Sequence, residues 1–185
     1  MTRLFTLILI LLLAGCARIP VAVAVDYQPG TDFTQLTRYY WLPPTKSAQP
    51  ASVYNSELVE QRVEMAVENE LVAHGLFPTD QRDQAQLLIS YLIVVEDRVD
   101  IDPVFAIEGS YSKHRGGMGV GLMRTHSTDY QQSRLIIDLR DPSEEQLLWR
   151  GSSERRLPGF DTPAEHAAFI AETVAAILAK YPPQP

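Results

Sequence analysis

Residues 85–95, with the sequence AQLLISYLIVV, decide the fold of this 185-residue chain. Apolar side chains occupy successive positions, so an extended segment with this sequence is apolar on both faces. A strand of that kind lies in the interior of a sheet, because a half-exposed strand alternates apolar and polar residues. We therefore expect a central strand here, with the flanking segments supplying its neighbours and the layer that covers them.

Four further segments have the composition of strands: residues 21–25, 33–42, 134–140 and 146–154. The last two flank the turn-forming residues 141–144, which predicts a β-hairpin. The segment 33–42 contains Tyr39, Tyr40 and Trp41, which form either a platform for sugar stacking or part of the core. We favour core packing, because a sheet that faces helices buries its aromatic side chains.

Two segments have the periodicity of amphipathic helices. The first, residues 56–74, ends before Gly75 and combines an apolar stripe (Val59, Val63, Ala66, Val67, Leu71) with a polar one (Glu57, Glu60 or Gln61, Glu64, Glu68). The second starts with Thr162, Pro163 and Glu165, which form a capping box with proline at the first helical position. Its apolar residues are Ala167, Ile170, Val174, Ile177, Leu178 and Tyr181.

The element order is strand, strand, helix, strand, an irregular excursion over residues 96–132, strand, strand, helix. Two amphipathic helices need an apolar sheet face to cover, and hairpin connections make most of that sheet antiparallel. We predict one α+β domain over residues 21–182. It has two layers, a mostly antiparallel sheet of about five strands with two helices packed on one face.

The N-terminus has the composition of a secretory signal peptide over residues 1–15. Arg3 precedes an apolar run, residues 4–13, that is too short to span a bilayer as a helix. The run leads into Ala14, Gly15 and Cys16, which resembles the lipobox of bacterial lipoproteins. That resemblance implies lipidation of Cys16, with residues 16–20 as a tether. In the alternative, Cys16 is a small apolar residue and cleavage occurs elsewhere.

Charge and cysteine content limit the possible partners. The net charge is −7, and Arg3 is the only charged residue before Cys16, so the remainder is one unit more negative. An acidic surface repels phosphates, which excludes nucleic acid as a partner and leaves the lipid as the membrane attachment. The resemblance to lipoproteins implies the outer membrane, facing the periplasm, because Ala17 and not aspartate follows the cysteine. Cys16 is the only cysteine, so we expect no disulfide.

Several segments together resemble a known family. They are Asp26–Tyr27, Asp32–Phe33, Tyr39–Trp41, Ala85–Tyr91, Leu135–Asp138 and Leu148–Gly151. With the lipobox, this set is similar to the bacterial lipoprotein family named domain of unknown function 4136, DUF4136. The resemblance implies a lipid-anchored periplasmic domain with no established activity, and it supplies no catalytic residues.

The excursion over residues 96–132 is the candidate interaction region. It begins acidic and becomes basic, with glycines alternating with Met118, Val120 and Leu122. The candidate interaction residues are Lys113, His114, Arg115, Met118, Val120, Leu122 and Arg124. Three interpretations stay open: a flexible hairpin whose acidic and basic arms pair across the strands, a docking site for a partner, or a small-ligand site.

Motifs for enzymatic or metal chemistry are weak. The glycines fit neither a phosphate loop nor a dinucleotide fingerprint, and Asp97, Asp100 and Asp102 lack the spacing of a calcium loop. The four histidines lack metal-ligand spacing, so we expect neither metal nor cofactor. Ser110, His126 and Asp129 permit a hydrolase hypothesis, although no nucleophile-elbow sequence surrounds the serine.

The sequence therefore predicts a non-catalytic outer-membrane lipoprotein. Its periplasmic domain binds an envelope protein partner or maintains the envelope. The alternative is a lipoprotein that binds a small ligand or glycan in a cleft near the glycine-rich excursion, and a hydrolase is the third hypothesis.

Overall fold

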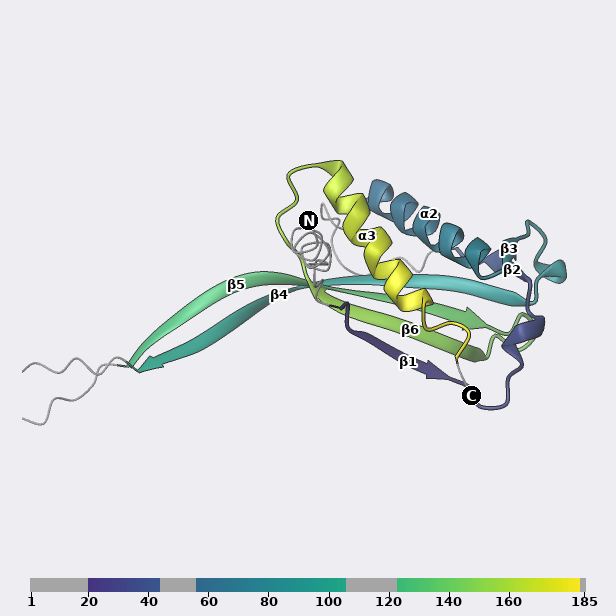
Figure 1. The fold of residues 1–185 in the computed structure, drawn as a ribbon, viewed down its shortest axis with the longest axis horizontal. Helices are drawn as coiled ribbons and strands as arrows, with labels where there is room; N and C mark the ends of the chain where they lie inside the picture. The colour runs from purple at the N-terminus through teal and green to yellow at the C-terminus, as the bar shows by residue number, and fades with distance from the viewer. Residues whose placement is uncertain (1–19, 44–55, 106–122, 184–185) are drawn as a thin grey trace, which may run out of the picture.

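The structure, a computed structural model, describes residues 20–43, 56–105 and 123–183. In this part of the chain six strands form one sheet with two helices on one of its faces (Figure 1). The strands in spatial order are β1 (Val23–Tyr27), β6 (Leu147–Arg156), β5 (Met123–Arg140), β4 (Leu87–Phe105), β2 (Arg38–Trp41) and β3 (Phe77–Pro78). The helices are α2 (Glu57–Ala73) and α3 (Pro163–Leu178), and two short 3-10 helices are η1 (Phe33–Gln35) and η2 (Arg82–Gln84).

The pairing of the strands confirms the predicted two-layer α+β class. The β1/β6, β6/β5 and β5/β4 pairs are antiparallel, whereas β2 runs parallel to both β4 and β3. β3 and β4 run parallel to β2 because α2, which follows β2, carries the chain back to the end of the sheet at which β2 begins. The described strands number six and not about five, since the two-residue strand β3 adds to the edge beside β2.

The core lies between the helices and the sheet, and the predicted central strand supplies its middle. Leu87 and Ile89 of β4 are fully buried in this core, and Leu88 is fully buried on the opposite face of the sheet. The helices contribute the apolar positions that the periodicity predicted: Val59, Val63, Val67 and Leu71 from α2, and Ile170, Val174, Ile177 and Leu178 from α3. None of the helices in the described residues is long and apolar enough to cross a membrane.

The predicted helix boundaries are confirmed in detail. At the start of α3 the Thr162 hydroxyl accepts the amide N–H of Glu165 at 3.2 Å, and the Glu165 carboxylate accepts the amide N–H of Asp161 at 2.9 Å. Gly75 follows the end of α2 with φ at +81°, a left-handed conformation that glycine adopts without strain. Local capping therefore sets where both helices begin or end.

The composition predicted one strand over residues 33–42, and this prediction is wrong for the first part of the segment. Asp32 accepts the amide N–H and the hydroxyl of Thr34, which starts the 3-10 helix η1, and Phe33 turns into the core. The strand β2 begins only at Arg38. A short polar side chain that bonds to the backbone two residues ahead favours a turn over an extended strand.

The prediction of an irregular excursion is wrong for residues 96–105 and 123–132. β4 and β5 continue without a break in their pairing, from Glu96 opposite Gln132 to Phe105 opposite Met123. These two segments, which we call the hairpin arm, project away from the helices and the rest of the sheet (Figure 1). Acidic residues of β4 face mostly neutral polar partners, as where the Gln131 amide donates to Asp97 at 3.0 Å.

Candidate functional site

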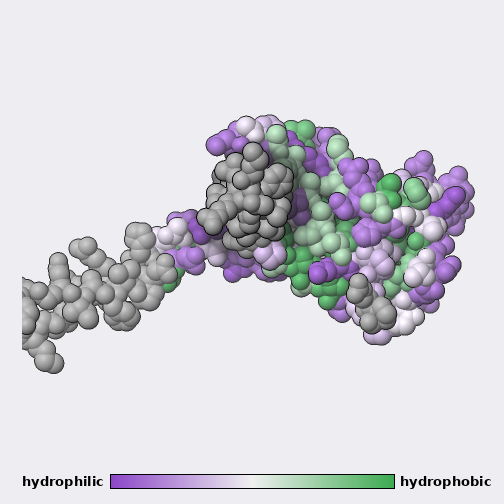
Figure 2. All heavy atoms as spheres, viewed as in Figure 1, coloured by the Kyte–Doolittle hydropathy of each residue, from purple (hydrophilic) through white to green (hydrophobic). Residues whose placement is uncertain are grey.

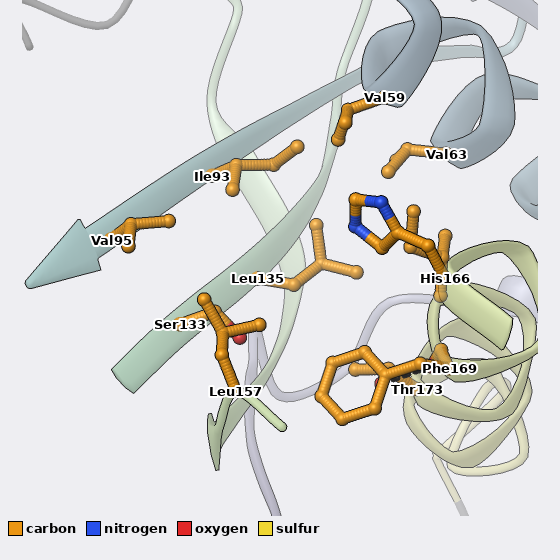
Figure 3. A pocket seen from close by; sticks show the side chains of 11 residues that line it. Val59, Val63, Ile93, Val95, Ser133, Leu135, Leu157, His166, Phe169 and Thr173 are labelled. Atoms are coloured by element: carbon orange, nitrogen blue, oxygen red, sulfur yellow. Dashed lines mark hydrogen bonds between the residues drawn. The ribbon is translucent and has the colours of Figure 1, made fainter. Parts of the chain in front are cut away.

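A small apolar pocket lies where the hairpin arm leaves the helices. It has a volume of about 40 Å³ and draws its walls from both helices, β4, β5 and the segment after β6. Its lining residues are Val59, Val63, Ile93, Val95, Ser133, Leu135, Leu157, His166, Phe169, Ile170 and Thr173. Figure 3 shows the His166 ring directed between Val59, Val63 and Leu135. Almost every group that a bound molecule would contact in this pocket is apolar.

His166 is the pocket's titratable group, and it lies in the first turn of α3. Its ring stacks on Phe160 with centroids 4.5 Å apart, and its Nδ1 lies 3.4 Å from Arg62 Nη1. Because a guanidinium only donates, Nδ1 is the acceptor of this contact. Burial first, and then the positive charge of Arg62, lower the pKa of His166. The imidazole is therefore neutral at neutral pH.

Arg155 holds one side of the pocket in place. Its guanidinium lies over the Phe169 ring at 4.0 Å and donates to the Thr173 hydroxyl at 2.7 Å and the Glu172 carboxylate at 2.9 Å. These contacts join β6 to α3 and fix two lining residues. The pocket can accept a small aliphatic group, and within the described residues no three His, Cys, Asp or Glu side chains come together as metal ligands.

The apolar face of β4 continues past the pocket onto the hairpin arm. Side chains two positions apart lie on the same face of a strand, so Val99 and Ile101 extend the line that Ile93 and Val95 begin. Val99 is 56% exposed and Ile101 is 64% exposed. Asp97 interrupts the line, and its carboxylate accepts the hydrogen bond from Gln131. The core face of the sheet thus reaches solvent where the helices no longer cover it.

Most of the predicted interaction residues fall outside this description. Lys113, His114, Arg115, Met118, Val120 and Leu122 lie outside the described residues, as does Cys16. Arg124 lies in β5 opposite Val104 of β4. Sequence reasoning missed Val99 and Ile101, although their spacing from Ile93 and Val95 was a usable signal. It missed the pocket contact of His166 as well, for which the sequence has no signal.

The described residues do not support the hydrolase hypothesis or a calcium site. Ser110 lies outside the described residues, and His126 and Asp129 lie three positions apart on one strand. Asp97 and Asp100 are also three apart on a strand, so they point to opposite faces and do not converge on a cation.

Tyr39 and Trp41 of β2 pack in the core, as predicted, whereas Tyr40 is half-buried on the opposite face of the strand. Tyr39 is fully buried, and Trp41 packs edge-on against both Tyr39 and Tyr91 with centroids 6.0 Å apart. Two glutamates of the predicted polar stripe of α2 turn toward these rings. Trp41 donates to Glu68 at 3.0 Å and Tyr91 donates to Glu64 at 3.4 Å. Burial and then the Glu68 charge raise the pKa of Tyr39 to about 12.

A charged network lies on the sheet face that α2 and α3 do not cover. Asp138 is buried and accepts two hydrogen bonds from Arg150, at 2.6 and 2.7 Å, and one from Arg140 at 2.9 Å. The bonds to Asp138 raise the pKa of Arg150. Arg140 also donates to the carbonyl oxygen of Glu145 at 3.2 Å, so the network joins β5, β6 and the turn between them, and we assign it a structural role.

Fold and site together define a two-layer α+β domain whose central strands project as a hairpin arm. The chain belongs to the family described as domain of unknown function (DUF4136), whose model matches residues 23–183. This confirms the family that the sequence resembled. A comparison with curated proteins finds no match.

Several solved structures are similar to this one. A PDZ domain protein from Parabacteroides distasonis has a TM-score of 0.55 and 14% identity, over 89% of this chain and 36% of that chain. The PelC dodecamer from Paraburkholderia phytofirmans has a TM-score of 0.46 and 12% identity, over 85% of this chain and 94% of that chain. A DUF4136 family protein from Bacteroides thetaiotaomicron has a TM-score of 0.42 and 14% identity, over 86% and 93%. The chain spans about a third of the Parabacteroides protein, and that likeness concerns the fold alone.

Proposed function

We propose that this protein is an outer-membrane lipoprotein, anchored by a lipid on Cys16 and facing the periplasm. Its DUF4136 domain binds an envelope protein partner, or maintains the envelope through such contacts, and catalyses no reaction. The observation that carries the proposal is the apolar face of β4, which continues uncovered onto the hairpin arm at Val99 and Ile101.

Burial of the exposed apolar side chains of the hairpin arm favours binding of a partner there. A two-stranded hairpin alone in water is marginally stable, because it has no third layer to bury its apolar side chains. Burying a valine or isoleucine side chain fully contributes roughly 1.5–3 kcal/mol. Val99 and Ile101 are more than half exposed, so most of that contribution is available to a partner that covers this face.

The charge of the arm indicates the chemistry of the partner. Over residues 96–105 and 123–132 the arm carries five acidic residues (Glu96, Asp97, Asp100, Asp102 and Asp129) against Arg98 and Arg124. Hydrophilic side chains dominate the part of the arm next to the body in the space-filling view (Figure 2). Complementary charge across an interface speeds association and excludes partners of the wrong sign. We expect an apolar ridge on the partner, flanked by lysine or arginine.

The docking proposal is tested by Ile101→Glu in living cells, with crosslinking followed by mass spectrometry. We expect the variant to fold normally and to lose the crosslinked partner that the wild-type protein captures. The matched control is Met65→Glu on α2, because Met65 is 62% exposed and Ile101 is 64% exposed. Equal capture by the wild-type protein and the Ile101 variant would contradict docking at the arm.

Anchoring is tested separately by Cys16→Ser. Without the thiol there is no site for the thioether-linked lipid, so we expect the variant to leave the membrane fraction. The mass of the mature wild-type protein should show a chain that begins at Cys16 and carries fatty acyl groups. A variant that stays with the membrane would show that the lipid is not the attachment.

The size of the pocket favours docking over ligand binding at the base of the arm. Pockets for small molecules usually have volumes of about 300–1,000 Å³, whereas this pocket has about 40 Å³. It accommodates an aliphatic side chain of a partner but not a sugar ring.

A further inference from the structure

The strand β1 forms one edge of the sheet, and this edge is open among the described residues. β1 pairs with β6 on one side, and no described strand pairs with its other side (Figure 1). The opposite edge is a poor template for another strand, because β3 has only two residues and Pro78 has no N–H to donate. β1 has five residues without proline, lysine or a bulge, and an edge of this kind can accept a further strand.

The backbone groups of β1 alternate between the two sides of the strand. Gln28, directly after β1, donates its N–H to the carbonyl oxygen of Leu148 in β6 at 2.8 Å. Residues two positions apart direct their backbone groups to the same side of an antiparallel strand, so the even-numbered residues of β1 face β6. The N–H and C=O groups of Val23, Val25 and Tyr27 therefore point away from the sheet, and no described strand pairs with them.

The side chains of these three residues form one row on the side of the sheet that faces the helices. Val23 packs against the core, and Tyr27 contacts the buried Phe33 ring edge-on at 6.5 Å. Val25 is nevertheless 37% exposed and Tyr27 is 40% exposed. The edge thus presents unpaired backbone groups and partly exposed apolar side chains at the same positions.

We propose that β1 pairs antiparallel with β1 of a second copy of this chain, with Val25 opposite Val25 across a twofold axis. In this register Val23 of each copy lies opposite Tyr27 of the other, and all five residues of β1 are paired. The outward-pointing residues then face one another, which is the arrangement in which both N–H···O bonds are exchanged. A shift by one residue would set outward-pointing residues against inward-pointing ones and would lose this match.

The charge of β1 fits the same register. Asp26 lies on the other face of the strand, opposite Arg150 in its own sheet. In the proposed pair it lies opposite Ala24 of the second copy, so the two aspartates do not face each other directly. β1 is no part of the hairpin arm, which belongs to β4 and β5, so this pairing does not depend on the docking proposed there.

The first test is the oligomeric state of the full-length protein in detergent, measured by sedimentation equilibrium at several protein concentrations. A single pair of strands makes a small interface, so we expect a reversible dimer with a Kd on the order of 10 μM. Val25→Lys sets two like charges opposite each other and should raise the Kd at least about tenfold. The matched control is Val72→Lys on α2, where Val72 is 46% exposed, and it should keep the wild-type Kd. Circular dichroism checks that both variants fold.

Disulfide crosslinking tests the register, and it decides the question if Val25→Lys does not fold. In a hydrogen-bonded antiparallel pair the opposed Cα atoms are about 5.5 Å apart, which a disulfide can span. Mild oxidation of Val25→Cys should therefore give a covalent dimer. The control is Ala22→Cys, because Ala22 is exposed and lies just before β1, where the register puts the two thiols roughly 20 Å apart. The wild-type protein measures any crosslinking through Cys16, its only cysteine.

Three results would overturn the proposal. One is a wild-type protein that stays monomeric at concentrations on the order of 100 μM. Another is the wild-type Kd in a folded Val25→Lys variant, which would place the contact between copies elsewhere. The third is equal crosslinking of the cysteine variants at positions 25 and 22, which is incompatible with the antiparallel register.

Discussion

The inner and outer halves of strands β4 and β5 share one hydrogen-bonded ladder but have opposite surroundings. Over residues 87–95 the helices cover the sheet, and Leu87 and Ile89 are fully buried. Over residues 96–105 the same strand pairs as regularly with β5, yet Val99 and Ile101 are mostly exposed. Pairing extends a strand, whereas only a second layer turns its apolar face into a core.

The inner half of the strand pair sets the register of the outer half. The register of the pair is set where one face is buried, because a shift by one residue would move the apolar side chains of β4 to the wrong face. The arm then continues a ladder that is already aligned, with cross-strand contacts such as Asp97 with Gln131 adding to it. We therefore expect the body to determine stability and the arm to tolerate change.

The largest effect should come from one substitution made in each half. Ile89→Ala removes a fully buried side chain from β4 and should lower the free energy of unfolding by about 2–5 kcal/mol. Ile101→Ala, on the same strand and face, should change it by no more than about 0.5 kcal/mol. Urea denaturation followed by circular dichroism measures both, and equal effects would contradict the division into a core half and an exposed half.

A smaller loss of unfolding free energy is expected from a substitution at Gly151, where β6 packs against α3 in the covered half. A methyl group at Gly151 would overlap the Trp149 ring and the Ile177 side chain. Gly151→Ala should therefore cost about 1–3 kcal/mol by overpacking. Gly159→Ala is the control, since no atom lies within 4 Å of its added methyl group, and thermal unfolding that shows equal losses would contradict this account.

Substitutions in charged pairs should give a smaller difference in unfolding free energy between the two halves. Asp138→Asn removes a buried carboxylate that serves two arginines, and because those arginines stay partly hydrated we expect a loss of about 1–2 kcal/mol. Glu96→Gln breaks the exposed pair with Arg98 on the arm and should cost less than about 0.5 kcal/mol. Denaturation at two salt concentrations checks this, and a larger loss for the Glu96 variant would reverse the expected order.

The smallest effect concerns pH and His166 at the boundary between the halves. Its pKa is lower in the folded protein than in the unfolded chain, so the unfolded chain binds the proton more readily. Its contribution to stability is complete above the unfolded value near pH 6.5 and is lost as the pH falls toward the folded pKa. His166→Gln should flatten this part of the curve of unfolding free energy against pH, and parallel curves for the variant and the wild type would contradict it.

Local signals accounted for most of the fold. The capping residues around Thr162 and the 3.6-residue spacing of Val59, Val63 and Val67 act within one or two turns of chain, so the sequence alone predicts them well. The apolar run 85–95 likewise predicted a buried strand. The candidate site was harder, because Val99 and Ile101 have ordinary strand composition and their exposure depends on where α2 and α3 end.

The class of fold, the family and the position of the helices could be predicted from the sequence, because periodicity, capping and composition are properties of neighbouring residues. The extension of β4 and β5 beyond the helices, and the turning of Glu64 and Glu68 toward aromatic rings, follow from tertiary packing. Those outcomes depend on contacts between segments far apart in the chain. A residue's burial is set by what packs over it, and the residue's own neighbours do not encode that.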